Sequence, residues 1–162
     1  MIGNIHFRID ERLIHGQVVL SWLGMLNVTR IMVVDEEISK DTIQLPLLKM
    51  VCPPSVKLSV LAPKNAADNI LAGKYSADRV FLLVKNPETL LELWDAGVHM
   101  ETVNFGNMSG TGDTVMLMKN VNVTQKNIES FKELNRRGVH ITVRTIPGDP
   151  EVSLMQLIEK GK

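Results

Sequence analysis

The sequence predicts an α/β protein built on a single open, mostly parallel, twisted sheet with helices on both faces. Apolar runs without alternation, such as RIMVVD at 30–35 and RVFLLV at 79–84, are typical of strands covered on both faces. Segments with helical spacing of apolar residues lie between these runs, and the connections are short. The 162 residues show no internal repeat and no linker, so we expect one domain over residues 1–162.

The expected elements alternate along the chain. Strands are predicted at 5–9, 30–35, 56–61, 79–84, 102–105 and 139–143, with short candidates at 115–118 and 121–123. Helices are predicted from near His15 to about 26, from Ser39 or Asp41 to about 51, and at 63–71, 86–96, 124–137 and 154–158.

Caps and helix breakers set the limits of these helices. Asn86 and Thr124 are suitable first residues, while Gly97 and Gly138 are suitable stops. Pro46 lies inside the second predicted helix, and we expect it to kink that helix or to delay its start.

Composition excludes several classes of protein. Eighteen basic residues balance eighteen acidic ones, which argues against a sequence-independent nucleic-acid binder. Cys52 is the single cysteine, so no intrachain disulfide forms and a reducing compartment is expected. The sequence shows neither a signal peptide nor an apolar run long enough to span a membrane, so we expect a soluble, cytoplasmic protein.

The segment Phe7–Gln17, FRIDERLIHGQ, carries the strongest indication of chemistry. Here an apolar run ends in a charged loop, and an amphipathic run with helical spacing follows. The loop crowds five ionisable side chains into eight positions: Arg8, Asp10, Glu11, Arg12 and His15. Because ligands of parallel sheets bind beyond the carboxyl ends of the strands, we expect this loop at a functional edge. We expect the acidic residues 35–37, Lys85 and the Gly-rich loop 106–113 at the same edge.

This loop suits phosphoryl transfer with His15 as the nucleophile. A neutral imidazole is a competent nucleophile near pH 7. At the first turn of a helix, the unpaired backbone N–H groups of Gly16, Gln17 and Val18 are expected to hold phosphate oxygens. Arg12, with Arg8, would complement the charge of the transferring group, and Asp10 would orient the imidazole or hold an arginine.

Simpler interpretations of the same residues remain open at this point. A histidine beside a strand end is commonly structural, and neighbouring Arg and Asp side chains commonly form a surface ion pair. The other histidines lack clustered metal-ligand partners, so we expect no metal site, and phosphoryl transfer by positioning and charge needs no cofactor. The loop 106–113, GNMSGTGD, is either a mobile turn or a phosphate-binding rim.

The residues also resemble a known family. RIDERLIHGQVVLSWL closely resembles the start of the IIB component of the bacterial phosphoenolpyruvate-dependent sugar phosphotransferase system, in its mannose/fructose/sorbose branch. The resemblance continues through IMVVDEEI, LLKMVCPPSVKLSVL, the NFGNM loop and VTQKNIESFKELNRRGVHITVRTIPGDP, and so covers essentially the whole chain. The family pattern often reads G-G-M where this chain has Asn107, and relatives usually have a helix former in place of Pro46.

This resemblance implies a cytoplasmic phosphocarrier that associates with the inner face of the cell membrane. Its phosphohistidine maps onto His15, its phosphate-stabilising arginine onto Arg12 and its acidic position onto Asp10. The implied donor is the phosphohistidine of a IIA protein or domain, and the implied acceptor is a sugar held by the membrane subunits IIC and IID. Such proteins are often homodimers, and no residue here indicates the oligomeric state, the sugar or the reacting nitrogen of His15.

Two other functions are compatible with such a chain. One is a regulatory or binding domain that keeps the fold and senses partner proteins without turnover. The other is a metal-free phosphatase with a histidine intermediate, although the loop offers no obvious second acid or base for it. Transfer of phosphate to sugar in the presence of IIC and IID separates the phosphocarrier from both.

Overall fold

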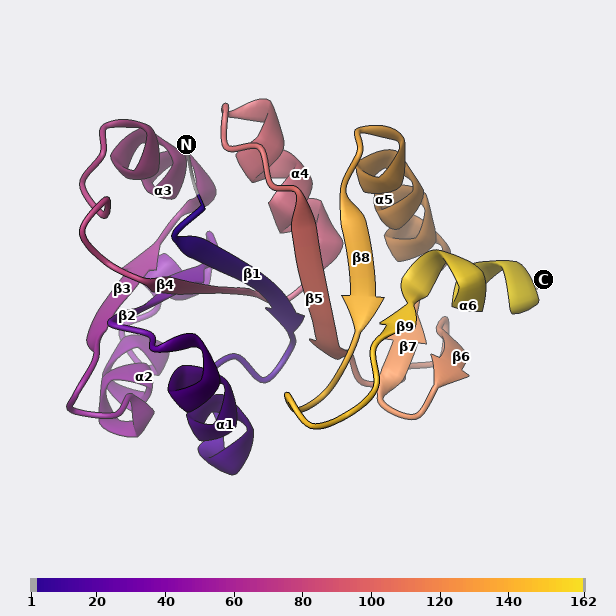
Figure 1. Ribbon diagram of the computed structural model, residues 1–162, viewed down its shortest axis with the longest axis horizontal. Helices are drawn as coiled ribbons and strands as arrows, with labels where there is room; N and C mark the ends of the chain where they lie inside the picture. The colour runs from indigo at the N-terminus through magenta and orange to yellow at the C-terminus, as the bar shows by residue number, and fades with distance from the viewer. Residues whose placement is uncertain (1–2, 162) are drawn as a thin grey trace.

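A seven-stranded sheet forms the centre of the computed structural model, which describes residues 3–161 (Figure 1). Its strand order is β3-β2-β4-β1-β5-β8-β9, and every neighbouring pair is parallel except β8 and β9. The expected open, mostly parallel sheet is therefore confirmed. The strands are β1 (Ile5–Asp10), β2 (Arg30–Val34), β3 (Lys57–Leu61), β4 (Val80–Val84), β5 (Thr102–Asn107), β8 (His140–Val143) and β9 (Val152–Ser153).

Helices cover both faces of this sheet, because each parallel connection must cross back over it. The smaller apolar core packs α1 (Gly16–Leu26) and α2 (Gln44–Val51) against one face. The larger core packs α3 (Pro63–Leu71), α4 (Pro87–Asp95), α5 (Gln125–Arg136) and α6 (Leu154–Lys160) against the other. A separate hairpin of β6 (Val115–Met118) and β7 (Val121–Val123) follows β5, and a short 3₁₀ helix, η1 (Ile38–Lys40), precedes α2.

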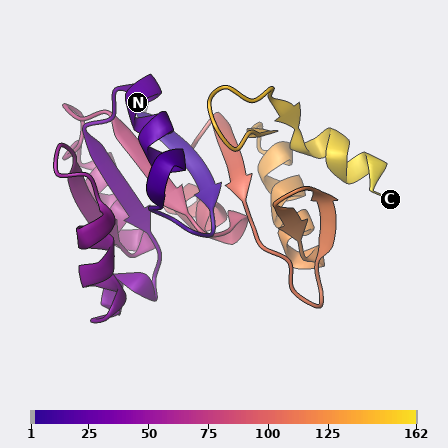
Figure 2. The same ribbon diagram turned by 90° about the horizontal axis from the view of Figure 1, so that it is seen from below.

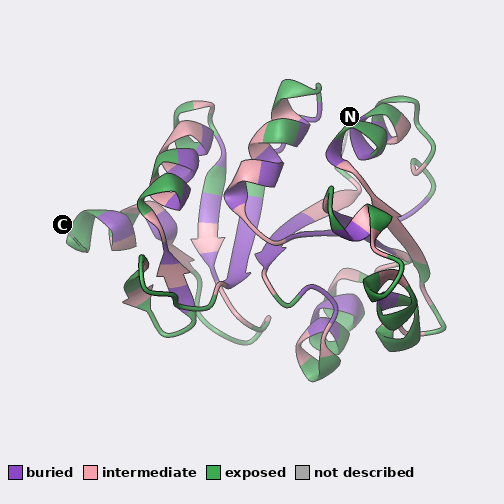
Figure 3. Cartoon of the chain, turned by 180° about the vertical axis from the view of Figure 1, so that it is seen from behind, coloured by how far each residue is buried: buried purple, intermediate pink, exposed green. Residues whose placement is uncertain are grey.

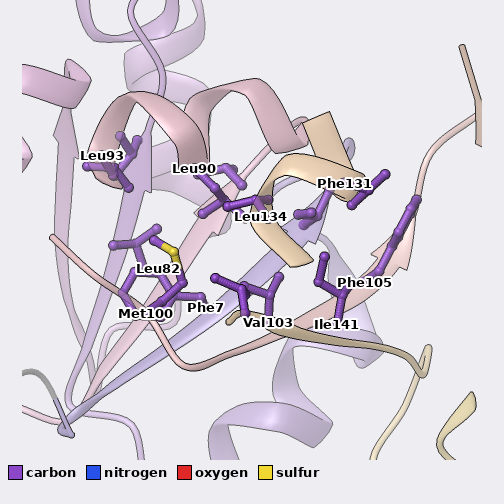
Figure 4. Packing of buried hydrophobic residues seen from close by; sticks show 14 of the residues in the cluster. Phe7, Leu82, Leu90, Leu93, Met100, Val103, Phe105, Phe131, Leu134 and Ile141 are labelled. Atoms are coloured by element: carbon purple, nitrogen blue, oxygen red, sulfur yellow. The ribbon is translucent and has the colours of Figure 1, made fainter. Parts of the chain in front are cut away.

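Burial follows the layers that the sequence pattern predicts. All five residues of β4 are buried, as expected for a central strand covered on both faces, and Figure 3 shows buried residues concentrated in the strands and in the inner faces of the helices. Figure 4 shows part of the larger core, where the rings of Phe105 and Phe131 stack with centroids 5.3 Å apart. This packing holds the carboxyl ends of the strands as a rigid edge.

The helix limits mostly match the capping signals in the sequence. The side chain of Asn86 accepts a hydrogen bond from the backbone N–H of Thr89, and Thr124 forms a capping box with Asn127. The second helix begins only at Gln44, so Pro46 lies in its first turn and the expected delay is confirmed. Asp41 accepts hydrogen bonds from the N–H groups of Ile43 and Gln44, which makes it the capping side chain.

Candidate functional site

The segment that links β1 to α1 lies at the carboxyl edge of the sheet (Figures 1 and 2). β1 runs one residue further than predicted, to Asp10, and α1 begins at Gly16, directly after His15. A turn closed by the hydrogen bond from the Leu13 N–H to the Asp10 carbonyl, at 2.9 Å, reverses the chain between them. The loop 11–15 therefore stands between a buried strand end and a helix start.

Two buried side chains anchor the loop that carries His15. Leu13 and Ile14 are buried in the smaller core, whereas Arg12, Gly16 and Gln17 are exposed. Leu13 has a φ of +57°, a left-handed conformation that is strained for a branched side chain. The burial of Leu13 holds the backbone in this conformation, and its carbonyl oxygen consequently points toward the ring of His15.

The carboxylate of Asp10 is the centre of the site. It is fully buried, and its Oδ2 atom lies 3.0 Å from Nη2 of Arg8. Its Oδ1 atom accepts hydrogen bonds from the backbone N–H of Arg12 at 3.1 Å and from Nε of Arg12 at 3.2 Å. Asp10 therefore fixes both the backbone and the side chain of Arg12, whose guanidinium stays 42% exposed and able to meet an anion.

His15 occupies the position just before the helix and is 21% exposed. Its Nδ1 atom lies 3.0 Å from the carbonyl oxygen of Leu13, to which it donates a hydrogen bond when it carries the ring proton. Its Nε2 atom is buried without a hydrogen-bond partner and lies 3.6 Å from Oδ2 of Asp10. That distance is too long for a hydrogen bond, so Asp10 acts on the ring as a nearby negative charge.

The start of α1 offers an anion-binding position beside this ring. The first hydrogen bond of the helix runs from the Val19 N–H to the His15 carbonyl, so the N–H groups of Gly16, Gln17 and Val18 have no acceptor within the helix. The first turn carries no acidic residue to compete for these groups. The predicted juxtaposition of His15, Arg12 and three free N–H groups is therefore present.

Arg8 is placed differently from the other predicted phosphate ligands. Its side chain is only 1% exposed, and both of its terminal nitrogens already bond to protein oxygens: the Asn104 side chain, the Asp10 carboxylate and the carbonyls of Arg144 and Thr145. Burial lowers the pKa of Arg8 from its ordinary value, while the charge of Asp10 opposes that effect. This geometry favours a role in holding Asp10 over direct contact with a phosphoryl group.

The Gly-rich segment that follows β5 lies against the same loop. The Glu11 N–H donates to the Asn107 carbonyl at 3.0 Å, and the Glu11 carboxylate accepts from the N–H and hydroxyl of Ser109 at 2.6 and 2.7 Å. Asn107 does not have a positive φ, so this position does not need the glycine that the family pattern often has there. The segment thus supports the loop that carries His15.

Other predicted neighbours share the edge without contacting the loop. The acidic residues follow β2 and Lys85 follows β4, as the parallel topology requires. Asp35 caps the 3₁₀ helix through the Ile38 N–H, and Glu36 pairs with Lys40. Between residues 3 and 161, no hydrogen bond or ion pair joins these residues to the segment 10–15.

Two residues that contact Arg8 were not among the predicted site residues. Asn104 accepts a hydrogen bond from Arg8 and is buried between Val103 and Phe105 of β5. A polar side chain between two buried apolar ones was the signal in the sequence that could have identified it. Trp22 was expected only in the core; its Nε1 also donates to the Thr145 carbonyl at 2.9 Å, and the Arg8 guanidinium lies 5.1 Å from its ring centroid.

Neither a metal-binding cluster nor a membrane-spanning helix is present within residues 3–161. No group of three or more His, Cys, Asp or Glu side chains within 3–161 could hold a metal ion. In the same part of the chain, none of the helices has the length and apolar character required to cross a membrane.

Comparison with known proteins identifies the family. The family model "PTS system sorbose subfamily IIB component" matches residues 5–162. The chain belongs to this family. Among curated relatives, it is 40% identical over 153 residues to the mannose-specific EIIAB component of Escherichia coli K12, an alignment that covers 94% of this chain and 47% of the relative. This chain therefore spans about half the length of that relative.

Shorter IIB relatives match over nearly their whole length. The sorbose-specific EIIB component of Klebsiella pneumoniae is 32% identical over 153 residues, covering 94% of this chain and 93% of that protein. The crystal structure of the IIBSor domain of the sorbose permease from the same organism superimposes with a TM-score of 0.92, at 32% identity and 96% coverage of both chains. The fold of this chain is thus that of a IIB component.

Proposed function

We propose that this protein is a phosphocarrier that accepts a phosphoryl group on His15 and passes it to a sugar as a IIB component of the phosphotransferase system. The observation that carries the proposal is the geometry at the start of α1. There the partly exposed His15 ring lies beside the exposed guanidinium of Arg12 and beside three N–H groups without helical acceptors. The membership of the IIB family supports the same assignment.

The proposed reaction consists of two transfers through one histidine. The lone pair of a His15 ring nitrogen attacks the phosphorus of a phosphohistidine on a IIA partner, and the donor imidazole leaves with the electrons of the broken P–N bond. A sugar hydroxyl then attacks the phosphorus on His15, the imidazole leaves with the electrons of the P–N bond, and the imidazole takes up a proton in place of the one that the hydroxyl loses. Arg12 and the N–H groups of Gly16, Gln17 and Val18 stabilise the charge on the phosphoryl oxygens in both steps.

The partners and the place of action follow from this role. We propose that a IIA protein or domain supplies the phosphoryl group and that the membrane subunits IIC and IID hold the sugar. The protein would then act in the cytoplasm, at the inner face of the membrane. The names of the relatives include mannose-specific and sorbose-specific components, so the class of acceptor that we propose is a hexose.

Intact-mass spectrometry tests the proposal. After incubation with phosphoenolpyruvate and the upstream phosphotransferase proteins, the protein should gain about 80 Da in an acid-labile form. The His15→Ala variant should gain nothing and should remain folded, because its side chain makes one hydrogen bond, to the Leu13 carbonyl. The matched control is His140→Ala, which removes an exposed histidine at the opposite edge of the sheet and should label normally.

The alternatives predict different outcomes of the same experiment. A regulatory domain would show no mass gain even with a competent IIA partner. A phosphatase would release free phosphate without sugar, whereas a phosphocarrier should deliver the label to sugar only after membranes containing IIC and IID are added. Labelling that persists in His15→Ala would overturn the assignment of the nucleophile.

A further inference from the structure

The buried guanidinium of Arg8 connects three separate parts of the chain. Nη1 donates to the Asn104 side chain of β5 and to the Arg144 carbonyl after β8, and Nη2 donates to Asp10 of β1 and to the Thr145 carbonyl. The four N–H bonds of the two terminal nitrogens are therefore all used. The guanidinium also lies over the ring of Trp22 in α1. Its position is fixed by the fold and not by a ligand.

The carboxylate of Asp10 lies between Arg8 and the two reactive groups, His15 and Arg12. Its Oδ2 atom lies 3.0 Å from Arg8 and 3.6 Å from Nε2 of His15, while Oδ1 receives two N–H groups of Arg12. Because the carboxylate is fully buried, separating it from the Arg8 guanidinium is costly. We therefore expect a displaced Arg8 to displace Asp10, and with it the Arg12 side chain and the negative charge that faces His15.

Gly106 shapes the space that holds the guanidinium. A Cβ atom at this position in β5 would overlap the Cζ, Nη1 and Nη2 atoms of Arg8. The requirement for glycine at 106 is steric, since its φ is not in the left-handed region. The glycine in the NFGNM loop is consequently explained by the side chain of Arg8, which precedes it by almost a hundred residues.

We propose that Arg8 is a positioning residue for the phosphoryl transfer at His15, that it acts through Asp10, and that Gly106 is the residue that lets it do so. The inference rests on the proposed function of His15. It assigns Arg8 no contact with the phosphoryl group, and it extends the functional unit to Asn104 and to the backbone of 144–145.

A second arginine in the same protein provides a matched control for a purely structural role. Arg30 is 17% exposed, pairs with Asp78 at 2.9 Å, donates to Ser59 and lies 5.0 Å from the ring of Tyr75. It begins β2, at the amino edge of the sheet, opposite His15. Arg30→Lys therefore alters a comparable ion pair without reaching the site. For Gly106→Ala the control is Gly24→Ala in α1, where a Cβ atom has open space.

The first experiment needs no partner protein. The ¹⁵N resonances of both His15 ring nitrogens are measured in Arg8→Lys, in Gly106→Ala and in the two controls. We expect both resonances to move in Arg8→Lys and Gly106→Ala and to stay at wild-type positions in Arg30→Lys and Gly24→Ala. Unchanged His15 resonances in folded Arg8→Lys and Gly106→Ala would overturn the proposal, as would equal movement in the controls.

The second experiment measures phosphorylation of His15 by phosphorylated IIA and by phosphoramidate, a small donor that needs no docking. A misplaced reacting group costs on the order of 10- to 100-fold in rate, and we expect Arg8→Lys and Gly106→Ala to lose that much with both donors. Wild-type rates in both variants would contradict a positioning role. If the wild type itself takes no phosphate from IIA while the ring resonances respond as expected, the proposed function fails and the positional coupling stands.

A double variant separates the steric effect of Gly106 from general damage to β5. Arg8→Met removes the guanidinium with which a new Cβ atom would overlap. Adding Gly106→Ala to Arg8→Met should therefore reduce the rate by less than twofold beyond Arg8→Met alone, although Gly106→Ala by itself costs 10-fold or more. Multiplicative losses in the double variant would show that Gly106 acts independently of Arg8 and would overturn that part of the proposal.

Discussion

Arg12 and Arg8 both pair with Asp10, and their different exposure predicts different effects of their loss on stability. Arg12 is 42% exposed, so Arg12→Ala should lower the free energy of unfolding by less than about 1 kcal/mol. Because we propose that its guanidinium stabilises the phosphoryl oxygens, transfer to His15 should slow by on the order of 10²-fold or more. Arg8→Met removes the buried partner of a buried carboxylate, which then keeps only the partly exposed Arg12, and should destabilise by roughly 3–5 kcal/mol.

Urea unfolding measures the free energy of unfolding, and rapid-quench phosphorylation of the same preparations measures the rate of transfer to His15. Lys85→Ala is the control for net charge, since it removes one positive charge from the same edge of the sheet without breaking any hydrogen bond to the segment 10–15. Transfer at the wild-type rate in Arg12→Ala would remove Arg12 from the reactive group.

His6 makes the protein sensitive to mild acid. Burial, together with the positive charges of Arg8 and Arg144, lowers the pKa of His6 from 6.5 to about 4. The unfolded chain therefore binds a proton that the folded protein excludes between those two pH values. The free energy of unfolding is unaffected by His6 above about pH 6.5. As the pH falls from there toward 4, it should decline by roughly 1.4 kcal/mol for each pH unit.

The His6→Phe variant isolates this contribution. The imidazole stacks near Trp22 and Phe81, at centroid distances of 5.5 and 5.6 Å, so a phenyl ring fits the same environment. Urea unfolding between pH 4.5 and 7 should show a steeper loss of stability in the wild type than in His6→Phe. Parallel curves for the two proteins would show that another group carries the acid sensitivity.

The residues of the site were predictable to the extent that they are close in sequence. Crowding of charge in the segment 8–15 was sufficient to single out Asp10, Arg12 and His15, and the structure brings these three together. That the Arg8 guanidinium is fully occupied by protein acceptors was not predictable, because the acceptors other than Asp10 lie 96 to 137 positions further along the chain. The need for glycine at position 106 was not predictable for the same reason, since the local sequence does not show that the distant Arg8 side chain will pack against this residue.

At the level of elements, hydrophobic period and capping residues predicted nearly all of the strands and helices. The errors lie at the ends of elements, where local signals compete with packing, and in one short strand that was not predicted. β1 extends to Asp10 because the Glu11 N–H continues its bonding to β5 at the Asn107 carbonyl. The short β9 was missed because its two residues carry no period of their own and pair with β8 only after the chain has turned back.

We expect α2 to be less stable than α1, the other helix on the same face of the sheet. Leu48 is its one buried residue, while Ile43, Leu47 and Met50 are more than half exposed. Helices with little buried apolar surface open at low free-energy cost, so the amides of 47–51 should exchange with deuterium faster than those of α1, which buries Val19, Trp22 and Leu23. Hydrogen exchange followed by NMR measures both sets at once, and protection of α2 equal to that of α1 would contradict this ranking.

On the scale of the whole molecule, the fold explains why the site could be located before its geometry was known. Parallel strands carry their carboxyl ends to one edge, and the reversal of strand order on either side of β1 leaves a place there for a loop. The sequence predicted this edge correctly, including the Gly-rich segment beside the loop. It did not predict which of the edge residues meet, because that depends on how α1 and the segment 144–145 pack around Arg8.

The small exposed area of His15 leads to a prediction about how the two partners share it. The ring is 21% exposed between the buried Leu13 and Ile14 and the start of α1, and each transfer requires the reacting atoms to come within about 3–3.5 Å. IIA and the membrane subunits should therefore exclude one another from the same face of the protein. A IIA variant that lacks its own reactive histidine cannot take the phosphoryl group back, and it should inhibit sugar phosphorylation competitively.

Steady-state kinetics with the phosphorylated protein, membranes containing IIC and IID, and increasing amounts of that IIA variant measure this competition. We expect the apparent KM for the phosphorylated protein to rise while kcat stays constant, because the inhibitor removes the carrier from the membrane subunits without altering the transfer step. A protein unrelated to the phosphotransferase system, at the same concentrations, should leave both constants unchanged. A fall in kcat at constant KM would mean that IIA and the membrane subunits bind together, which would require docking surfaces on different sides of His15.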